Sequence, residues 1–252
     1  MKFHEYISTH HVFTTEDAKK ATPSASSTES LLKRAVGAKK IDRVRRGLYV
    51  SKTGKHLDAN ADPFEIISTL ASDAVLSYHA ALVAHGVAHN IFSEYCFRTT
   101  SVFTPFQYRG VRYRPLPLNK RVRTQTVRGK AFGAAVVTTR EQTIVDCLSR
   151  PSLCGGIEEV LRSLSTFPYI DFAELHAVSK TASTSAKTRI GWLLEAKQDV
   201  WRVDKQTLDT YHSALHSGRV QLDPGTKDKK YRAAAWQLYL PVDEEEVRSW
   251  LI

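Results

Sequence analysis

A chain of 252 residues with 42% hydrophobic and 25% charged residues has the composition of an ordinary globular protein, and it is long enough to bury a core in one or two domains. It has no apolar run of about 18 residues, so we expect no membrane-spanning helix, and the stretch from Met1 to Glu5 lacks the apolar segment of a signal peptide. Three cysteines are too few for a disulfide framework, so we expect the protein in a reducing cytoplasm.

The net charge of +10 is concentrated in two segments. Residues 1–60 hold 12 Lys and Arg against 6 Asp and Glu, residues 98–130 hold 9 against none, and the remainder holds 15 against 20. Such clustering is typical of a protein that binds a polyanion. The alternative is a solvated surface on which cations gather by chance.

The first 22 residues predict two short helices. Residues 3–7 place aromatic and aliphatic side chains at helical spacing. The next helix, Thr14 to Ala21, has Thr14 as its N-terminal cap and acidic residues in its first turn, where the helix dipole favours them. It ends before Pro23, because the residue preceding a proline is disfavoured in helical geometry.

A third helix is predicted over Ser24 to Val36. Ser26 with Glu29 matches a capping box. The apolar face of the helix consists of Leu31, Leu32, Ala35 and Val36. The opposite, polar face consists of Ser27, Thr28, Ser30, Lys33 and Arg34.

Ile41 to Val50 alternates apolar and basic residues around Gly47, which predicts a β-ribbon with a tight turn. Helix, turn, helix and basic ribbon follow one another in the order of a winged helix-turn-helix. Ser and Thr at a helix start can donate to phosphates and base edges, and Arg can contact the backbone or a groove. The expected DNA contacts are Ser24, Ser26, Ser27, Thr28, Lys33, Arg34, Arg43, Arg45 and Arg46. A small helical domain with a solvated basic hairpin is the alternative.

Ser51 to Ala61 is polar, as is typical of a linker, and suggests a head over residues 1–55 and a body over residues 62–252. The body begins with a helix at Asp62-Pro63. A second helix, Ser77 to Gly86, is expected to be capped by Ser77 and stopped by the glycine. The histidines of this region are expected to pack or cap rather than to bind a metal.

Strands are predicted over residues 94–100, 108–114, 122–127 and 134–138, in a small, mostly antiparallel sheet. Basic residues punctuate it, with Tyr108 and Tyr113 interleaved. Such a face can bind a nucleic-acid backbone, and an edge hairpin kept soluble by charge is the alternative. The DNA contacts predicted here are Arg109, Arg112, Arg114, Arg121 and Arg123.

The remainder predicts helices over 139–148, 157–164, 172–180, 183–198, 205–215 and 243–251, with a strand over 231–240. The fold class is therefore α+β. No phosphate-binding loop or G-x-S-x-G motif occurs, so we expect no catalytic residues, no cofactor and no metal. Glu195-Ala196-Lys197 has the Glu-x-Lys spacing of metal-dependent nucleases, and a nuclease is kept as the enzyme alternative.

Four motifs in this order resemble the AbiEi-type antitoxin and transcriptional regulator family of type IV toxin–antitoxin, or abortive-infection, systems. They are Arg43 to Val50, Ser77 to Gly86, Thr139 to Asp146 and Arg189 to Glu195. Together they span most of residues 13–196. No such motif follows about residue 200.

The resemblance implies a winged-helix domain that binds inverted repeats in its own promoter as double-stranded DNA. It also implies a C-terminal domain that counteracts a nucleotidyltransferase-like toxin encoded beside it, without a need for stable contact. Since one head contacts one half-site, an inverted repeat requires two chains, as a dimer or as monomers that meet on DNA. The other hypothesis is a winged-helix regulator unrelated to a toxin, whose body binds a small effector.

Overall fold

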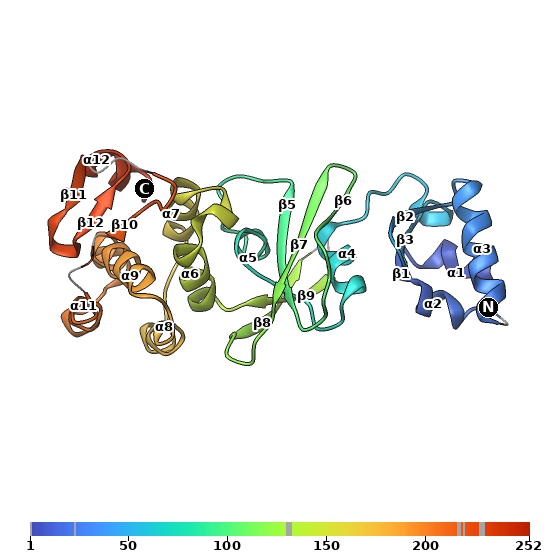
Figure 1. Ribbon diagram of the computed structural model, residues 1–252, viewed down its shortest axis with the longest axis horizontal. Coiled ribbons are helices and arrows are strands. Elements are labelled where there is room, and N and C mark those ends of the chain that lie inside the picture. The colour runs from blue at the N-terminus through green and yellow to red at the C-terminus, as the bar shows by residue number, and fades with distance from the viewer. Residues whose placement is uncertain (1, 23, 130–132, 216–217, 219, 227–229) are drawn as a thin grey trace. The chain divides into compact units, whose positions relative to one another are not determined.

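The computed structural model describes residues 2–22, 24–129, 133–215, 218, 220–226 and 230–252 (Figure 1). The chain has a mixed α/β fold, consistent with the predicted α+β class. Its contacts divide it into two compact units. Unit 1 contains Met1–Ala74, Ser93–Pro117 and Arg128–Ala135, and unit 2 contains Val75–Phe92, Leu118–Val127 and Val136–Ile252. The division into residues 1–55 and 62–252 stays a prediction.

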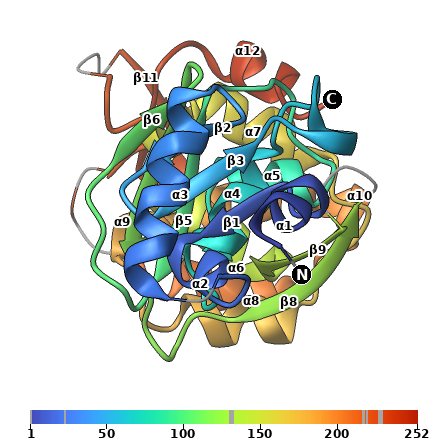
Figure 2. The ribbon, with the colours of Figure 1, turned by 90° about the vertical axis from the view of Figure 1, so that its right-hand side faces the viewer.

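The first part of unit 1, which we call the head, covers residues 2–51. Its elements in order are α1 (Phe3–Thr9), β1 (Val12–Thr14), α2 (Thr15–Lys19), α3 (Ala25–Gly37), β2 (Ile41–Arg45) and β3 (Leu48–Ser51). The strands form an antiparallel sheet in the order β1-β3-β2, and the three helices cover one face of it (Figures 1 and 2). The core between them contains Ile7, Phe13, Leu32 and Ile41, which are all buried.

Side-chain caps fix where the head helices begin. Thr14 accepts a hydrogen bond from the Asp17 backbone N–H (3.1 Å), and Asp17 accepts from the Thr14 N–H (3.2 Å), which confirms the predicted cap. The predicted box at Ser26 and Glu29 is wrong. Ser24 has an extended backbone and accepts from the Ser27 N–H (3.2 Å), so the helix begins two residues earlier.

The β-ribbon is confirmed, with Gly47 at φ +83° in its turn. Strand β1 was not predicted. It pairs with β3 from Val12↔Val50 to Thr14↔Leu48, and a strand of three residues is too short for its alternation to be distinguished from a loop.

Unit 1 continues with η1 (Gly54–His56), α4 (Pro63–Leu70), β5 (Glu94–Thr99), β6 (Phe106–Tyr108) and β7 (Val111–Pro117). The α4 cap is confirmed, because Asp62 accepts from the Phe64 N–H at 2.7 Å. The predicted strand 108–114 is correct for residues 111–114, which lie in β7, and wrong in its continuity. Arg109 (φ +48°) and Gly110 (φ +81°) form a turn that reverses the chain between β6 and β7.

The expectation of a mostly antiparallel sheet is also wrong for the longest strand pair of unit 1. Strands β5 and β7 are parallel from Glu94↔Arg112 to Thr99↔Pro117, and only the three-residue β6 pairs antiparallel with β7. The short β6 lets the chain return beside β5 in the same direction, and the sequence pattern does not reveal this excursion.

Unit 2 is mainly helical. Its helices are α5 (His79–Ala84), α6 (Arg140–Ser149), η2 (Pro151–Cys154), α7 (Ile157–Ser165), α8 (Phe172–Ser179), α9 (Thr184–Ala196), α10 (Gln198–Trp201), α11 (Lys205–His212), η3 (Ala234–Trp236) and α12 (Glu244–Ser249). Its strands include β4 (Val75–Leu76), β10 (Val220–Gln221), β11 (Tyr231–Ala233) and β12 (Leu238–Leu240). Strands β8 (Thr124–Gly129) and β9 (Gly133–Thr138) begin or end in unit 1. Strands β4 and β9 pair in parallel through Leu76↔Val137.

Two predictions for unit 2 need correction. Ser77 does not cap α5, because its hydroxyl donates to the Val75 carbonyl and Tyr78 precedes the helix with φ +58°. The predicted strand 231–240 is a β11–β12 hairpin, since η3 and Gln237 at φ +50° interrupt it. Helices are confirmed at the predicted ranges 139–148, 172–180, 183–198, 205–215 and 243–251, and they are capped by the side chains of Thr139, Asp171, Ser183, Asp204 and Asp243.

The histidines after β4 pack against backbone, as expected. A ring nitrogen of His79 lies 3.1 Å from the Asn90 carbonyl oxygen, and one of His85 lies 2.9 Å from that of Thr138. None of the helices in the described residues has the length and apolarity needed to cross a lipid bilayer.

Candidate nucleic-acid interface

The head contains a groove of ≈ 610 Å³ that brings α2, α3 and the β2–β3 ribbon together. Leu32, Val36 and Tyr49 supply apolar lining. The charged side chains along it are Glu16, Lys19, Glu29, Lys33, Arg43 and Arg46. The groove therefore joins residues of the predicted third helix to residues of the predicted ribbon, although they are far apart in the sequence.

Most of the charged side chains in this groove that have no ion-pair partner in the described part of the chain are cationic. Lys19 is held by Glu16 at 2.6 Å. Lys33, Arg43 and Arg46 are exposed, and none of the three has an ion-pair partner among the described residues. Three unpaired cations around a concave surface attract an anionic chain.

The predicted polar residues of α3 divide into exposed and structural groups. Ser24 and Ser26 are exposed at the helix start, and the Ser27 hydroxyl donates to the Ser24 carbonyl at 2.8 Å. Lys33 and Arg34 are exposed one to two turns later. The expected exposure of Thr28 is wrong, because Thr28 is 0% exposed and its hydroxyl donates to the Ser24 carbonyl at 2.9 Å.

The ribbon arginines face two directions. Arg43 and Arg46 line the groove. The guanidinium carbon of Arg45 instead lies 5.0 Å from the ring centroids of both Phe103 and Phe106. A β-bulge between Arg43 and Arg45 accompanies this change of direction.

The second predicted group of DNA contacts lies on both units, with Arg109, Arg112 and Arg114 in unit 1 and Arg121 and Arg123 in unit 2. Arg109 pairs with Asp42 at 2.9 Å. Arg112 (3.5 Å) and Arg114 (2.7 Å) share Glu94, and hydrogen bonding to that carboxylate raises the pKa of Arg114. Arg123 lies 3.7 Å from Glu174.

Residues 98–130 lack carboxylates in the sequence, but the fold supplies them from elsewhere. Of the five predicted arginines, Arg121 alone has no ion-pair partner in the described part of the chain. Lys130 lies outside the described residues. The structure therefore does not bring these arginines together as a patch of free cations.

Several residues of this region were not predicted from the sequence. Lys19 lies one turn after Glu16 on α2, so helical spacing was a signal for its place beside the groove. Asp42 holds Arg109, and Phe103 and Phe106 hold Arg45. These contacts could not be predicted from the sequence pattern, because the partners are more than 55 residues apart.

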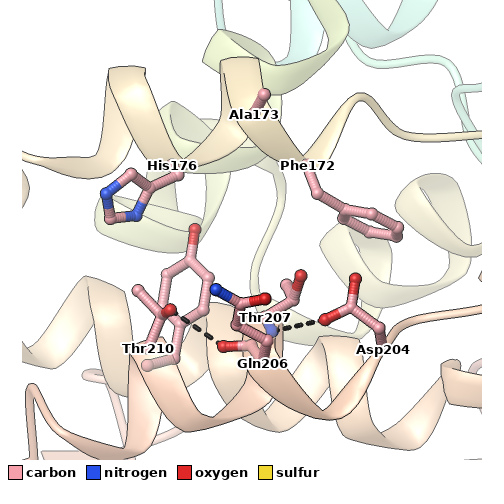
Figure 3. A pocket seen from close by; sticks show the side chains of 8 residues that line it. Phe172, Ala173, His176, Asp204, Gln206, Thr207 and Thr210 are labelled. Atoms are coloured by element: carbon pink, nitrogen blue, oxygen red, sulfur yellow. Dashed lines mark hydrogen bonds between the residues drawn. The ribbon is translucent and has the colours of Figure 1, made fainter.

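Unit 2 contains a separate pocket of ≈ 440 Å³ between α8 and α11 (Figure 3). Phe172 and His176 come from α8, and Gln206 and Thr210 come from α11. Asp204 uses one carboxylate oxygen to cap α11 through the Thr207 N–H at 2.7 Å. An aromatic ring, an imidazole and a carboxylate around an open cavity suit a small polar molecule.

The Glu-x-Lys motif serves packing in this fold. Glu195 lies on helix α9 rather than on a strand and accepts a hydrogen bond from the Trp236 indole N–H at 2.8 Å. The buried Lys197 Nζ donates to the Leu251 carbonyl at 3.0 Å. No group of three or more His, Cys, Asp and Glu side chains in the described residues is arranged to hold a metal ion.

The sequence matches no protein-family model and no curated protein. Among solved structures, the crystal structure of the RV2827C protein from Mycobacterium tuberculosis is similar, with a TM-score of 0.70 and 13% sequence identity. The similarity covers 95% of this chain and 90% of that one. At this identity it shows a shared fold across nearly the whole chain.

Proposed function

We propose that this protein is a DNA-binding regulator whose head is a winged helix-turn-helix, and that it acts as an AbiEi-type antitoxin. The order of head elements, α1-β1-α2-α3-β2-β3 with sheet order β1-β3-β2, supports the winged-helix assignment. In this arrangement α3 is the recognition helix and the β2–β3 ribbon is the wing.

The observation that carries the DNA-binding half is the set of free cations at the head groove. Lys33 on α3 and Arg43 and Arg46 on the ribbon line one concave surface without ion-pair partners in the described residues. The exposed Ser24 and Ser26 at the start of α3 add hydroxyl donors. Cations that fix the backbone and a helix start that reaches base edges are the two parts of duplex recognition.

DNA binding is tested by a gel-shift titration of the full chain with its upstream promoter and with random duplex of equal length. We expect tighter binding to the promoter and a log–log salt slope near −5 if about six phosphates are neutralised. R43Q and R46Q should each make the slope shallower by about 0.9, while R248Q, on α12 in unit 2, should leave it unchanged. Equal affinity for promoter and random duplex would reject a sequence-specific regulator.

The antitoxin half rests on the resemblance of the four motifs. Two of them shape the unit 2 core: Thr139 caps α6 through the Gln142 N–H at 3.2 Å, and Arg189 on α9 donates to the Leu148 carbonyl at 2.8 Å. Co-expression with the adjacent nucleotidyltransferase-like gene tests it. We expect growth rescue by the full chain and by R43Q, and loss of rescue with every form of the chain would reject antitoxicity.

A regulator that responds to a small effector is the second candidate, because the α8–α11 pocket offers a place for one. On this hypothesis the neighbouring genes belong to a metabolic operon, and D204N or F172A changes the response of DNA affinity to the operon's metabolites. An adjacent toxin gene, together with rescue by D204N, would favour the antitoxin.

A further inference from the structure

In unit 1, side chains of strand β2 contact side chains of the β6–β7 hairpin. Asp42 and Arg45 of β2 both face this hairpin, whereas Arg43 between them is exposed and lines the groove. Strict alternation would place Asp42 and Arg45 on opposite faces of the strand. The β-bulge between Arg43 and Arg45 shifts this alternation, so that Asp42 and Arg45 both reach the hairpin while Arg43 lines the groove.

Asp42 makes the polar contacts between β2 and the hairpin. Its Oδ2 atom accepts from the Tyr108 hydroxyl at 3.1 Å and from Arg109 Nη2 at 2.9 Å, and it lies 3.2 Å from Lys52 Nζ. Burial alone would raise the pKa of Asp42, but the hydrogen bonds from Lys52, Arg109 and Tyr108 outweigh it and hold the pKa below its ordinary value. The carboxylate is thus charged and multiply bonded at neutral pH.

Arg45 makes the contacts with aromatic rings, one of which belongs to the hairpin. Its guanidinium lies at 5.0 Å from the rings of both Phe103 and Phe106, which is the range of a cation–π contact. Its Nη1 atom is buried and has no hydrogen-bond partner among the described residues. The Phe106 ring also stacks on the buried Tyr113 at 4.7 Å, so Arg45 rests on a fixed surface.

The turn between β6 and β7 has an unfavourable backbone conformation, which the side-chain bonds of Arg109 stabilise. Arg109 adopts φ +48°, a left-handed backbone conformation that is unfavourable for a non-glycine residue. Its side chain donates to Asp42 and, through Nη1, to Asn60 at 2.8 Å. The bonds to β2 and to the segment after the ribbon fix a strained turn in place.

We propose that Arg45 and Asp42 form a latch that positions the wing, and that Arg45 holds the ribbon against β6 instead of contacting DNA. The latch sets the direction in which Arg43 and Arg46 present their charges. Arg45 is then a positioning residue for the DNA contacts that its neighbours make. This inference rests on the proposed DNA-binding function.

Salt dependence separates positioning from contact. Loss of a phosphate contact makes the log–log slope shallower by about 0.9. A loosened wing that still reaches the same bound position keeps its phosphate contacts, so it lowers affinity with little change in slope. We expect R45Q and F103A each to weaken promoter binding about threefold to tenfold, as the loss of a cation–π contact implies, with the wild-type slope. Because Phe103 carries no charge, its variant reports the latch alone.

The matched control is R43Q, which removes the same charge from the same strand on the groove side. We expect it to reduce the slope. The double variant R45Q/F103A should bind no more weakly than R45Q, since R45Q already removes the contact with Phe103. A reduced slope with R45Q, together with unchanged affinity in F103A, would overturn the latch.

A measurement without DNA keeps the latch separate from the proposed function. Hydrogen exchange of the full chain should show faster exchange at the β2 and β6 amides in R45Q and F103A, and wild-type exchange in R43Q. If exchange changes this way but no form of the protein binds DNA, the latch stands and the DNA-binding function fails. If R45Q and F103A exchange like the wild type, the latch is rejected.

Discussion

Arg114 donates two hydrogen bonds to Glu94 across the neighbouring parallel strands β7 and β5, from Nε to Oε1 at 2.7 Å and from Nη2 to Oε2 at 3.3 Å. Arg112, two residues earlier on the same strand, shares this carboxylate. A fork-like pair of this kind fixes both side chains on the sheet. A segment without carboxylates in the sequence is therefore not free of them in space.

We predict that Arg112 and Arg114 contribute little to DNA binding. R112Q and R114Q should leave the log–log salt slope of promoter binding within experimental error of the wild type. Both guanidinium groups are bound to Glu94, so neither neutralises a phosphate and displaces its counterion. R121Q is the comparison from the same segment, since the structure gives Arg121 no described partner. A slope reduced by about 0.9 in R114Q would show that its bond to Glu94 opens on DNA.

Thr28 should matter for stability and not for recognition. T28V keeps the shape of the side chain but removes the buried hydroxyl that donates to the Ser24 carbonyl and contacts the Thr22 hydroxyl. We expect a loss of about 1–2 kcal/mol in the free energy of unfolding, measured by urea titration. S26A, at the exposed neighbouring position, should change stability by less than about 0.5 kcal/mol. A stable T28V protein that has lost promoter preference would contradict this assignment.

Gly191 is required by the packing of Trp236. A Cβ at position 191 would overlap this indole ring. The ring cannot shift easily, since it stacks on His212 at 3.8 Å and its N–H donates to Glu195. G191A should destabilise the protein by about 1–3 kcal/mol. G37A is the matched control, because this glycine also lies in a helix but has open space around it, and it should be neutral or stabilising by up to about 1 kcal/mol.

Acid should weaken the fold through His85. Burial lowers the pKa of His85 from its ordinary value of 6.5, and this outweighs the hydrogen bond to the Thr138 carbonyl, which raises it. The unfolded chain then binds the proton more readily than the folded one, so stability falls as the pH drops below about 6.5. Thermal unfolding at pH 7.5 and 5.5 should show a smaller difference in Tm for H85Q than for the wild type. H176Q, at an exposed histidine, should match the wild type.

The features that the sequence predicted well are local. A cap requires only a hydroxyl or carboxylate a few residues before the N–H that it accepts from, so Thr14, Asp62 and Asp204 could be identified from the sequence. The ribbon turn was predictable for the same reason, because Gly47 takes the left-handed conformation that its position needs.

The features that the sequence did not predict depend on distant partners or on very short elements. The contact of Arg45 with Phe103 spans 58 residues, and the buried Thr28 hydroxyl contacts the hydroxyl of Thr22, which precedes the helix. Of the candidate site, Lys33, Arg43 and Arg46 line one groove, while four of the five predicted arginines of residues 98–130 pair with Asp42, Glu94 or Glu174. Charge counts along a sequence do not show which carboxylates the fold brings to them.

Strand β6 contacts the ribbon through Phe106 and Tyr108, and it is also an edge strand of its sheet. The outer strand of a sheet presents unpaired backbone groups that can recruit a strand from another molecule. In this protein that strand is three residues long, turns sharply at Arg109 and lies against β2. The contacts that hold the β2–β3 ribbon against β6 therefore also cover part of this edge strand. We expect variants that release β6 to aggregate on storage before they unfold, which light scattering would detect.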